Sequence, residues 1–132
     1  MKYMLDTNIC IFIMKDKTNV VNKYLEYKHL GISLSVMTLA ELQHGVAGSM
    51  YIEKSAKNLT DFLTGFEVLD FDSYAAVEYG KICADLYKKG TPIGTMDMLI
   101  GAHAKSAGLT LVTNNIREFS RIKGLMLEDW AN

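Results

Sequence analysis

The feature that most constrains the fold is the alternation of short apolar runs with longer segments of helical period. Five such runs have the length and composition of strands, at residues 2–5, 32–35, 67–69, 110–113 and, more briefly, 126–127. Strands that alternate with helices build a parallel sheet covered on both faces. The sequence therefore predicts an α/β fold with a central parallel sheet of about four or five strands flanked by helices.

The segments between these runs repeat apolar residues at the spacing of a helix. The expected helices lie at residues 18–28, 38–48, 52–66, 75–90 and 95–107. Thr38 is followed by Glu41 at the spacing of a capping box, so we expect the second helix to begin at Thr38. Thr95 is expected to cap the last helix in the same way.

Length and composition indicate one globular domain, residues 1–132. Of the residues, 49% are hydrophobic and 22% are charged, and there is one proline and no internal repeat. No apolar stretch approaches the ~20 residues that span a bilayer, and Asp6 precedes any apolar region of a signal peptide. Cys10 and Cys83 lie far apart in the sequence and do not suggest a disulfide scaffold. We therefore expect a cytoplasmic protein with no membrane segment.

Net charge does not identify the partner. The chain has 14 basic and 15 acidic residues, and a net charge of −1 argues weakly against nucleic-acid binding. A metal ion that neutralised four acids would leave 14 basic residues against 11 acidic ones. Charge alone leaves both possibilities open.

Four acidic residues are expected at one edge of the sheet. Asp6 directly follows the first strand, Glu41 begins a helix shortly after the second, and Asp97 lies in the first turn of a later helix. Glu118 lies one helical turn beyond Asn115, after the fourth strand. Ligands of parallel sheets bind outside the carboxyl ends of the strands. A group of carboxylates without basic neighbours repels itself unless a cation is present, and hard divalent cations prefer oxygen ligands. This placement predicts an acidic site for a divalent metal ion.

Each acid also has a structural interpretation. Asp6 is suited to cap a helix, Asp97 to complement a helix dipole, and Glu41 to complete a capping box. Glu118 is compatible with a solvated helix surface. The common placement of these residues at one edge favours the metal site over four independent explanations.

Six ordered segments of the sequence carry a resemblance to a known family. They are MLDTN at residues 4–8, TLAEL at 38–42 followed by Gly45, GTPIGTMD at 90–97, IGAHA at 100–104, LVTNNIREF at 111–119 and EDW at 128–130. This set resembles PIN-domain endoribonucleases, and specifically the VapC-type toxins of type II toxin–antitoxin systems. The resemblance covers essentially the whole chain.

The resemblance implies a PIN-like fold and a set of site residues. Asp6, Glu41 and Asp97 correspond to the family's ligands for Mg²⁺ or Mn²⁺. Many relatives have a fourth acid in a Thr-x-Asp pattern, where this chain has Asn115. Glu118 is the candidate for the missing carboxylate, so the catalytic set is expected to be Asp6, Glu41, Asp97 and Glu118. The fourth role stays open between Asn115 and Glu118.

Other polar residues are expected to support the site. Thr7, Asn8, Thr113 and Asn115 are suited to orient a water or a phosphate, and the first two are equally suited to cap a helix. Arg117 and Arg121 are the only arginines, and they flank Glu118, so they are candidates for holding the RNA backbone.

The function implied by the resemblance is that of a metal-dependent endoribonuclease toxin. Metal-activated water would cleave RNA and leave 5′-phosphate ends, with no use of the 2′-hydroxyl. Relatives of this length cut tRNA, often the initiator in its anticodon stem-loop, and so inhibit translation. A cognate VapB-type antitoxin is expected to neutralise the toxin in a hetero-oligomer.

The apolar helix faces suggest where partners bind. They carry Leu39, Leu42, Val46, Ile52, Leu59, Phe62 and Leu63. A groove along them would hold the antitoxin's C-terminal segment, which would plug the site with a basic side chain. The same surplus of apolar residues is compatible with core packing or with a homodimer interface.

Two other functions remain open from the sequence. A receiver-like phosphoacceptor domain also places acids and Mg²⁺ at strand ends, but it requires an early acid pair and a lysine after the last strand. Here Asp6 stands alone, and Asn114 and Asn115 occupy the place of that lysine. A non-catalytic RNA-binding module would keep the fold without the acids.

Overall fold

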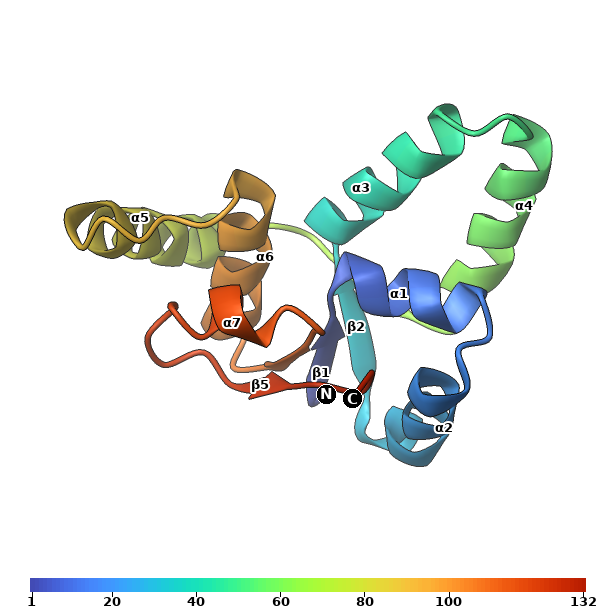
Figure 1. Ribbon diagram of the computed structural model, residues 1–132, viewed down its shortest axis with the longest axis horizontal. Helices are drawn as coiled ribbons and strands as arrows, with labels where there is room; N and C mark the ends of the chain where they lie inside the picture. The colour runs from blue at the N-terminus through green and yellow to red at the C-terminus, as the bar shows by residue number, and fades with distance from the viewer.

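The computed structural model describes residues 1–132 and has a five-stranded parallel sheet with helices on both faces (Figure 1). The strands are β1 (Tyr3–Leu5), β2 (Ile32–Ser35), β3 (Glu67–Leu69), β4 (Thr110–Val112) and β5 (Leu127–Glu128). Their order is β3-β2-β1-β4-β5, and every neighbouring pair is parallel. The predicted fold class and number of strands are confirmed.

Seven α-helices connect and cover the strands. They are α1 (Thr7–Met14), α2 (Thr18–Tyr27), α3 (Val36–Ala47), α4 (Ile52–Leu63), α5 (Ser73–Lys88), α6 (Thr95–Ser106) and α7 (Ile116–Phe119), with a 3₁₀ turn η1 (Lys28–Leu30) after α2. Helix α1 was not predicted, because six consecutive apolar residues, 9–14, show no helical period. None of the helices is both long and apolar enough to cross a membrane.

The sheet separates two hydrophobic cores. Tyr3 and Leu5 of β1 face the core that α1–α4 cover, whereas Met4 between them faces the core that α5–α7 cover. In β4, Leu111 and Val112 divide in the same way. This alternation follows from the two-residue period of a strand, and it places α1–α4 and α5–α7 on opposite sides of the sheet (Figure 1).

The N-caps of two helices, α3 and α6, are not the residues that the sequence indicated. The N-cap of α3 is Ser35, whose hydroxyl accepts a hydrogen bond from the Met37 amide at 3.0 Å, so the prediction of Thr38 as the cap is wrong. Thr38 is fully buried and its hydroxyl has no hydrogen-bond partner. The N-cap of α6 is Gly94 without a side-chain cap, so the role given to Thr95 is also wrong. Ser35, three residues before Thr38, has the extended backbone of an N-cap, and Gly94 takes the N-cap position directly before Thr95.

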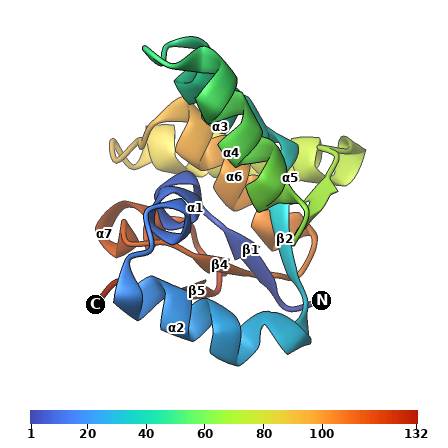
Figure 2. The same ribbon diagram turned by 90° about the vertical axis from the view of Figure 1, so that its right-hand side faces the viewer.

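The C-terminal segment closes the core next to β1. Trp130 is buried, packs edge-on against Tyr3 with ring centroids 5.3 Å apart, and stacks on Tyr27 at 5.9 Å. The two chain termini overlap in Figure 1 but lie on opposite sides of the molecule in Figure 2. The aromatic contacts attach the C-terminal segment to the core beside the central strand β1.

The strand order changes direction between β1 and β4. The chain moves from β1 through β2 to β3 on one side, and then crosses to β4 and β5 on the other. The carboxyl ends of strands on either side of such a point leave an open crevice. The next residues after these strands, Asp6 and Thr113, therefore face a common space.

Candidate active site

A polar hollow of about 320 Å³ lies at this crevice, and we call it the acidic hollow. Its lining contains no hydrophobic and no basic residue. The lining residues are Asp6, Thr7, Asn8, Glu41, Asp97, Asn114 and Asn115. Residues from four separate stretches of the chain thus meet at one place, as the positions of the acids predicted.

Asp6 is the most firmly held of the three acids. It follows β1, caps α1, and is only 5% exposed. One carboxylate oxygen accepts a hydrogen bond from the Thr7 amide at 2.7 Å, and the other accepts one from the Thr113 hydroxyl at 2.8 Å. Burial raises the pKa of the Asp6 carboxyl above its usual value, against the effect of these two hydrogen bonds. Asp6 therefore caps α1 and lines the acidic hollow at the same time.

Glu41 reaches the hollow from the middle of α3. It does not begin the helix, because α3 starts at Val36, and it forms no capping box with Thr38. Its carboxylate instead accepts a hydrogen bond of 2.5 Å from the Thr7 hydroxyl. This bond joins α1 to α3 and orients Glu41 next to Asp6.

Asp97 lies in the first turn of α6, as expected, and its carboxylate makes no hydrogen bond with another protein group. Burial raises the pKa of Asp97 to about 6, and the carboxylates of Asp6, Glu41 and Glu118 add to the rise. The negative charges of four acids therefore repel one another, and no basic side chain in the hollow compensates them. This carboxylate is the one most open to a cation or a proton.

The fourth position of the site involves two side chains, the amide of Asn115 and the carboxylate of Glu118. Asn115 precedes α7 and lines the hollow, whereas Glu118 is not among the lining residues. The Asn115 side-chain amide donates a hydrogen bond to Glu118 at 3.0 Å, and its backbone amide donates to the Thr113 hydroxyl at 2.9 Å. The structure thus brings Asn115 to the hollow directly and places Glu118 behind it.

The remaining expected residues are divided between the hollow and its surroundings. Asn8 lines the hollow and is exposed, and Thr113 is buried beneath Asp6. Arg117 is exposed on α7, and Arg121 donates a hydrogen bond to the Pro92 carbonyl at 3.2 Å in the segment before α6. Neither arginine lines the acidic hollow.

Sequence reasoning missed two features of the site. Asn114 lines the hollow, and its position directly after the fourth strand was the available signal. Ser35 and His103 form a buried hydrogen bond of 2.7 Å that joins the start of α3 to α6. Burial lowers the pKa of His103, which favours its neutral form. This pair holds the helices of Glu41 and Asp97 against each other, and the separation of 68 positions along the chain hides it from local sequence patterns.

The donor set of the hollow fits a hard divalent cation. Carboxylate and amide oxygens surround it, and the like charges of its acids are not compensated by the protein. No three acidic, histidine or cysteine side chains are arranged to hold an ion between them directly. Mg²⁺ commonly takes one or two carboxylates and keeps several waters, so the hollow suits an ion of this kind.

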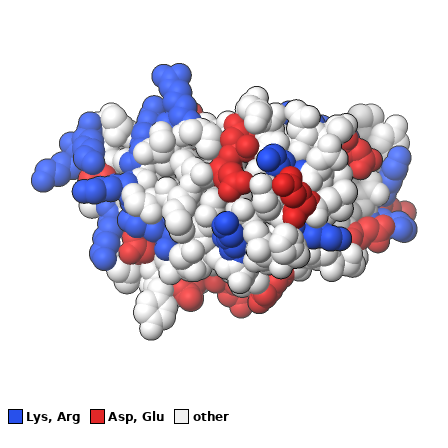
Figure 3. All heavy atoms as spheres, turned by 90° about the horizontal axis from the view of Figure 1, so that it is seen from below, with Lys and Arg blue, Asp and Glu red and all other residues white.

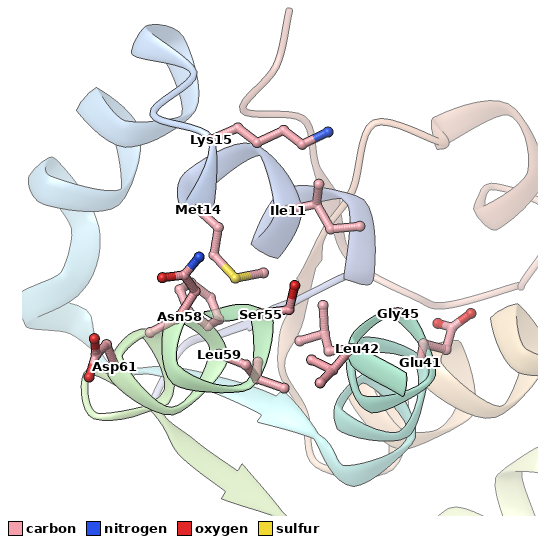
Figure 4. A pocket seen from close by; sticks show the side chains of 12 residues that line it. Ile11, Met14, Lys15, Glu41, Leu42, Gly45, Ser55, Asn58, Leu59 and Asp61 are labelled. Atoms are coloured by element: carbon pink, nitrogen blue, oxygen red, sulfur yellow. The ribbon is translucent and has the colours of Figure 1, made fainter. Parts of the chain in front are cut away.

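A second, larger hollow of about 640 Å³ lies between α1, α3 and α4, and we call it the apolar cleft (Figure 4). Half of its lining residues are hydrophobic, namely Ile11, Met14, Leu42, Val46, Leu59 and Phe62. Glu41 stands at one end of the cleft and Asp61 at the other (Figure 4). Because Glu41 also lines the acidic hollow, the two hollows share one wall, formed by α3.

The parallel sheet and its acidic hollow define a PIN domain. The sequence model of the PIN-domain family matches residues 3–125, and the chain belongs to this family. Within the family it falls among the VapC ribonucleases. The receiver-like alternative is excluded by this assignment.

Two known proteins and one crystal structure illustrate the similarity. The chain is 43% identical over 131 residues to the tRNA(fMet)-specific endonuclease VapC of Salmonella typhimurium, with 99% of each chain covered. It is 42% identical over 132 residues to the ribonuclease VapC2 of Rickettsia felis, with 98% of each covered. A crystal structure of VapBC2 from Rickettsia felis, bound to a DNA fragment from its promoter, superposes with a TM-score of 0.94 at 40% identity, covering 98% of this chain and 99% of that one.

Proposed function

We propose that this chain is a Mg²⁺- or Mn²⁺-dependent endoribonuclease, the toxin of a toxin–antitoxin pair, acting as one nuclease domain, residues 1–132. The observation that carries the proposal is the acidic hollow, in which Asp6, Glu41 and Asp97 meet without a basic side chain. Membership of the VapC ribonucleases supports the nuclease activity. A non-catalytic binding module would gain nothing from three self-repelling carboxylates.

Asp6, Glu41 and Asp97 would hold the cation, one or two of them directly and the others through the water molecules of its shell. When bound, the cation would polarise a phosphoryl oxygen and lower the pKa of a water molecule. Thr7 and Thr113 fix the orientation of Glu41 and Asp6 through their hydroxyl groups. The acids are therefore aligned before substrate arrives, which lowers the cost of assembling the site.

Polar side chains beside the acids would position the RNA. Asn8 and Asn114 are exposed at the rim of the acidic hollow, where their amides can bond to a phosphate or ribose. Asn115, oriented by Glu118, would fill the fourth position of the site. Water attack on the phosphodiester would break the bond to the 3′-oxygen and leave 5′-phosphate and 3′-hydroxyl ends.

The substrate we propose is tRNA, in particular the initiator, cut in its anticodon stem-loop. One relative with 43% identity is a tRNA(fMet)-specific endonuclease. An open hollow at the sheet edge requires an accessible phosphate, such as that of a loop, rather than one inside a duplex. Cleavage of the initiator would inhibit translation, and its substrate would place the toxin in the cytoplasm.

The partner we propose for the apolar cleft is a VapB-type antitoxin. The solved relative from Rickettsia felis is a VapBC2 assembly. An amphipathic C-terminal segment would bury its apolar side chains against α1, α3 and α4 (Figure 4). A basic side chain of that segment could pass Glu41 into the acidic hollow and occupy the place of the cation. Exposed apolar residues outside the cleft, such as Tyr74 and Val77 of α5, are available for a homodimer within the hetero-oligomer.

Incubation of the purified chain with total RNA tests the activity. We expect cleavage with Mn²⁺ and none with EDTA, and the Asp97→Asn variant provides the control for contaminating nucleases. Cleavage that persists in EDTA, or that Asp97→Asn retains, would contradict the proposal. RNA binding without cleavage under all conditions would instead support the non-catalytic module.

The ends of the products test the mechanism. Water attack predicts 5′-phosphate ends that can be ligated to an adaptor. Recovery of 2′,3′-cyclic phosphates would show that the ribose hydroxyl attacks, and would reject the role given to the acidic hollow.

A further inference from the structure

The basic residues of the chain are concentrated at one end of the molecule. Residues 81–123 contain seven of the 14 basic residues and only three of the 15 acidic ones. The rest of the chain consequently has seven basic and 12 acidic residues. Figure 3 shows the blue Lys and Arg side chains gathered at the end that carries α5, on the left in Figures 1 and 3. The near-neutral net charge therefore hides a strong separation of charge.

Three of these lysines surround a third hollow, of about 150 Å³, which we call the lysine hollow. Lys81 of α5, Lys105 of α6 and Lys123, beyond α7, line it. The largely buried side chains of Ile82, Leu86 and Ile122 also line it. Three cations from separate elements thus meet over one apolar depression.

Two acids offset only part of the positive charge of the lysine hollow: Asp85, which lines it, and Glu78, which lies beside two of its lysines. Glu78 lies 3.5 Å from Lys105 and 3.9 Å from Lys81, and Asp85 pairs with Lys89 at 3.1 Å. Lys123 also lines the hollow and makes no ion pair. Lys88 and Lys89 complement the C-terminal dipole of α5. That explanation does not apply to Lys81, in mid-helix, or to Lys123 in a loop.

A continuous stretch of chain leads from the acidic hollow to the lysine hollow. Asn115 lines the first and Lys123 lines the second, eight residues later. Between them lie Arg117, which is exposed, and Arg121, which is held by the Pro92 carbonyl just before the helix of Asp97. Basic residues therefore recur along the chain from α7 through the loop beyond it, between the acidic hollow and the lysine hollow, and a polyanion bound at both would contact them.

We propose that the lysine hollow binds the backbone phosphates of the RNA substrate at a distance from the scissile bond. The inference rests on the proposed function, because it assigns a second contact to the substrate of the acidic hollow. An extended row of cations fits a folded RNA, whose phosphates recur along its surface, better than a small anion. Lys81, Lys105 and Lys123 contribute affinity and not chemistry.

The test is the binding of bulk tRNA, measured in EDTA so that cleavage does not interfere. The variant Lys81→Gln/Lys105→Gln/Lys123→Gln removes three charges and keeps most of the side-chain packing. Lys23→Gln/Lys28→Gln/Lys54→Gln removes three charges from exposed lysines elsewhere and is the matched control. We expect the first variant to bind at least about tenfold more weakly and to reduce the slope of log affinity against log salt by about 2 to 3, and the control to change little.

Kinetics separate this contact from a structural effect. With Mn²⁺, the first variant should have a raised KM and an unchanged kcat, because the charges lie outside the acidic hollow. The single change Lys123→Glu cannot disturb an ion pair, and it should weaken binding in the same direction. Equal losses in both triple variants, an unchanged salt slope, or a fall in kcat alone would overturn the inference.

The same measurements distinguish this inference from the proposed function. If the wild type binds tRNA but does not cleave it, the proposed function fails and the lysine hollow is still tested by binding. If the wild type does not bind tRNA, the inference is overturned. It is also overturned if the triple variant keeps its tRNA affinity and loses affinity for an antitoxin, because the surface would then bind protein.

Discussion

The acidic hollow and the apolar cleft lie on two sides of α3 and have opposite properties. The acidic hollow has no hydrophobic lining residue, whereas half the lining of the cleft is hydrophobic. Glu41 belongs to both. The proposed site of chemistry and the proposed site of recognition therefore meet at one residue of α3, and a partner in the cleft would reach the acids past the Glu41 side chain. The comparison predicts that each hollow can be disabled without the other.

The largest effect is expected from Asp97→Asn. The change removes the carboxylate that makes no protein hydrogen bond, and it should lower cleavage of tRNA by about a thousandfold, or about 4 kcal/mol of transition-state stabilisation. Affinity for an antitoxin should change much less, because Asp97 does not line the cleft. Cleavage rates and antitoxin binding are measured on the same preparation. Asp6→Asn should also abolish activity, and cleavage within tenfold of wild type for both variants would contradict the site.

The same variant should be more stable than the wild type above pH 6. Because the pKa of Asp97 is raised from 3.8 to about 6, the folded state binds more protons than the unfolded state between these values. Stability therefore decreases as the pH rises through this interval, and Asp97→Asn removes the loss. Solvent screening limits the gain to about 1 kcal/mol, or about 4 °C in Tm. Thermal unfolding of both proteins below and above pH 6 shows whether the variant gains stability as the pH rises. A lower Tm for the variant above pH 6 would contradict the mutual repulsion of the acids.

Gly45→Phe should disable the cleft alone. Gly45 is exposed on α3, lines the cleft, and has no atom within 4 Å of the position that a Cβ would take. A phenyl ring would fill the cleft without backbone strain, and it should weaken antitoxin binding by about 100-fold, or about 2.7 kcal/mol. Cleavage should stay near the wild-type rate. Normal neutralisation of the variant by antitoxin would place the binding surface elsewhere.

A smaller effect is expected at the fourth position of the acidic hollow. Glu118→Gln should lower cleavage about tenfold, or about 1.4 kcal/mol, with partial rescue by higher Mn²⁺ concentration. Asn115→Ala should have a comparable effect, because the two side chains are joined by a hydrogen bond. In a double-mutant cycle the two losses should then not add. Additive losses would show that each residue acts independently.

A change in stability of similar size is expected where α3 is anchored. Ser35→Ala removes both the cap of α3 and the partner of His103, so it should cost about 1 to 2 kcal/mol of stability. Thr38→Val should be neutral or slightly stabilising, because the buried hydroxyl has no partner. Chemical denaturation compares the two variants. Equal destabilisation would restore Thr38 to the role that the capping-box pattern assigned to it.

The sequence revealed the acidic hollow better than the apolar cleft for a physical reason. The positions of Asp6 and Asp97 could be predicted because the end of a strand and the start of a helix are local features of the sequence. The parallel topology then brings these ends together. Glu41 was expected there through a capping box that does not exist, and it reaches the hollow from the middle of α3. Asn115 and Glu118 were both noted, but only the structure shows which of them faces the hollow.

Other parts of the structure depend on packing that no local pattern encodes. The apolar faces of α3 and α4 were recognised, but the cleft also requires Ile11 and Met14 of α1, a helix that the uniform apolar run concealed. The Ser35–His103 bond and the lysine hollow each join residues from distant parts of the chain. Such contacts depend on how the helices lie on the sheet, which periodicity does not determine.

The most direct test of the account is calorimetric titration of Mn²⁺ into the metal-free wild type and the Asp97→Asn variant, in the absence of RNA and antitoxin. The account predicts binding at one acidic hollow in the wild type, accompanied by proton release near pH 6, because the cation displaces the proton that Asp97 holds there. It predicts binding at least about tenfold weaker in the variant. Equal Mn²⁺ affinity in the two proteins would contradict the claim that these carboxylates form the metal site.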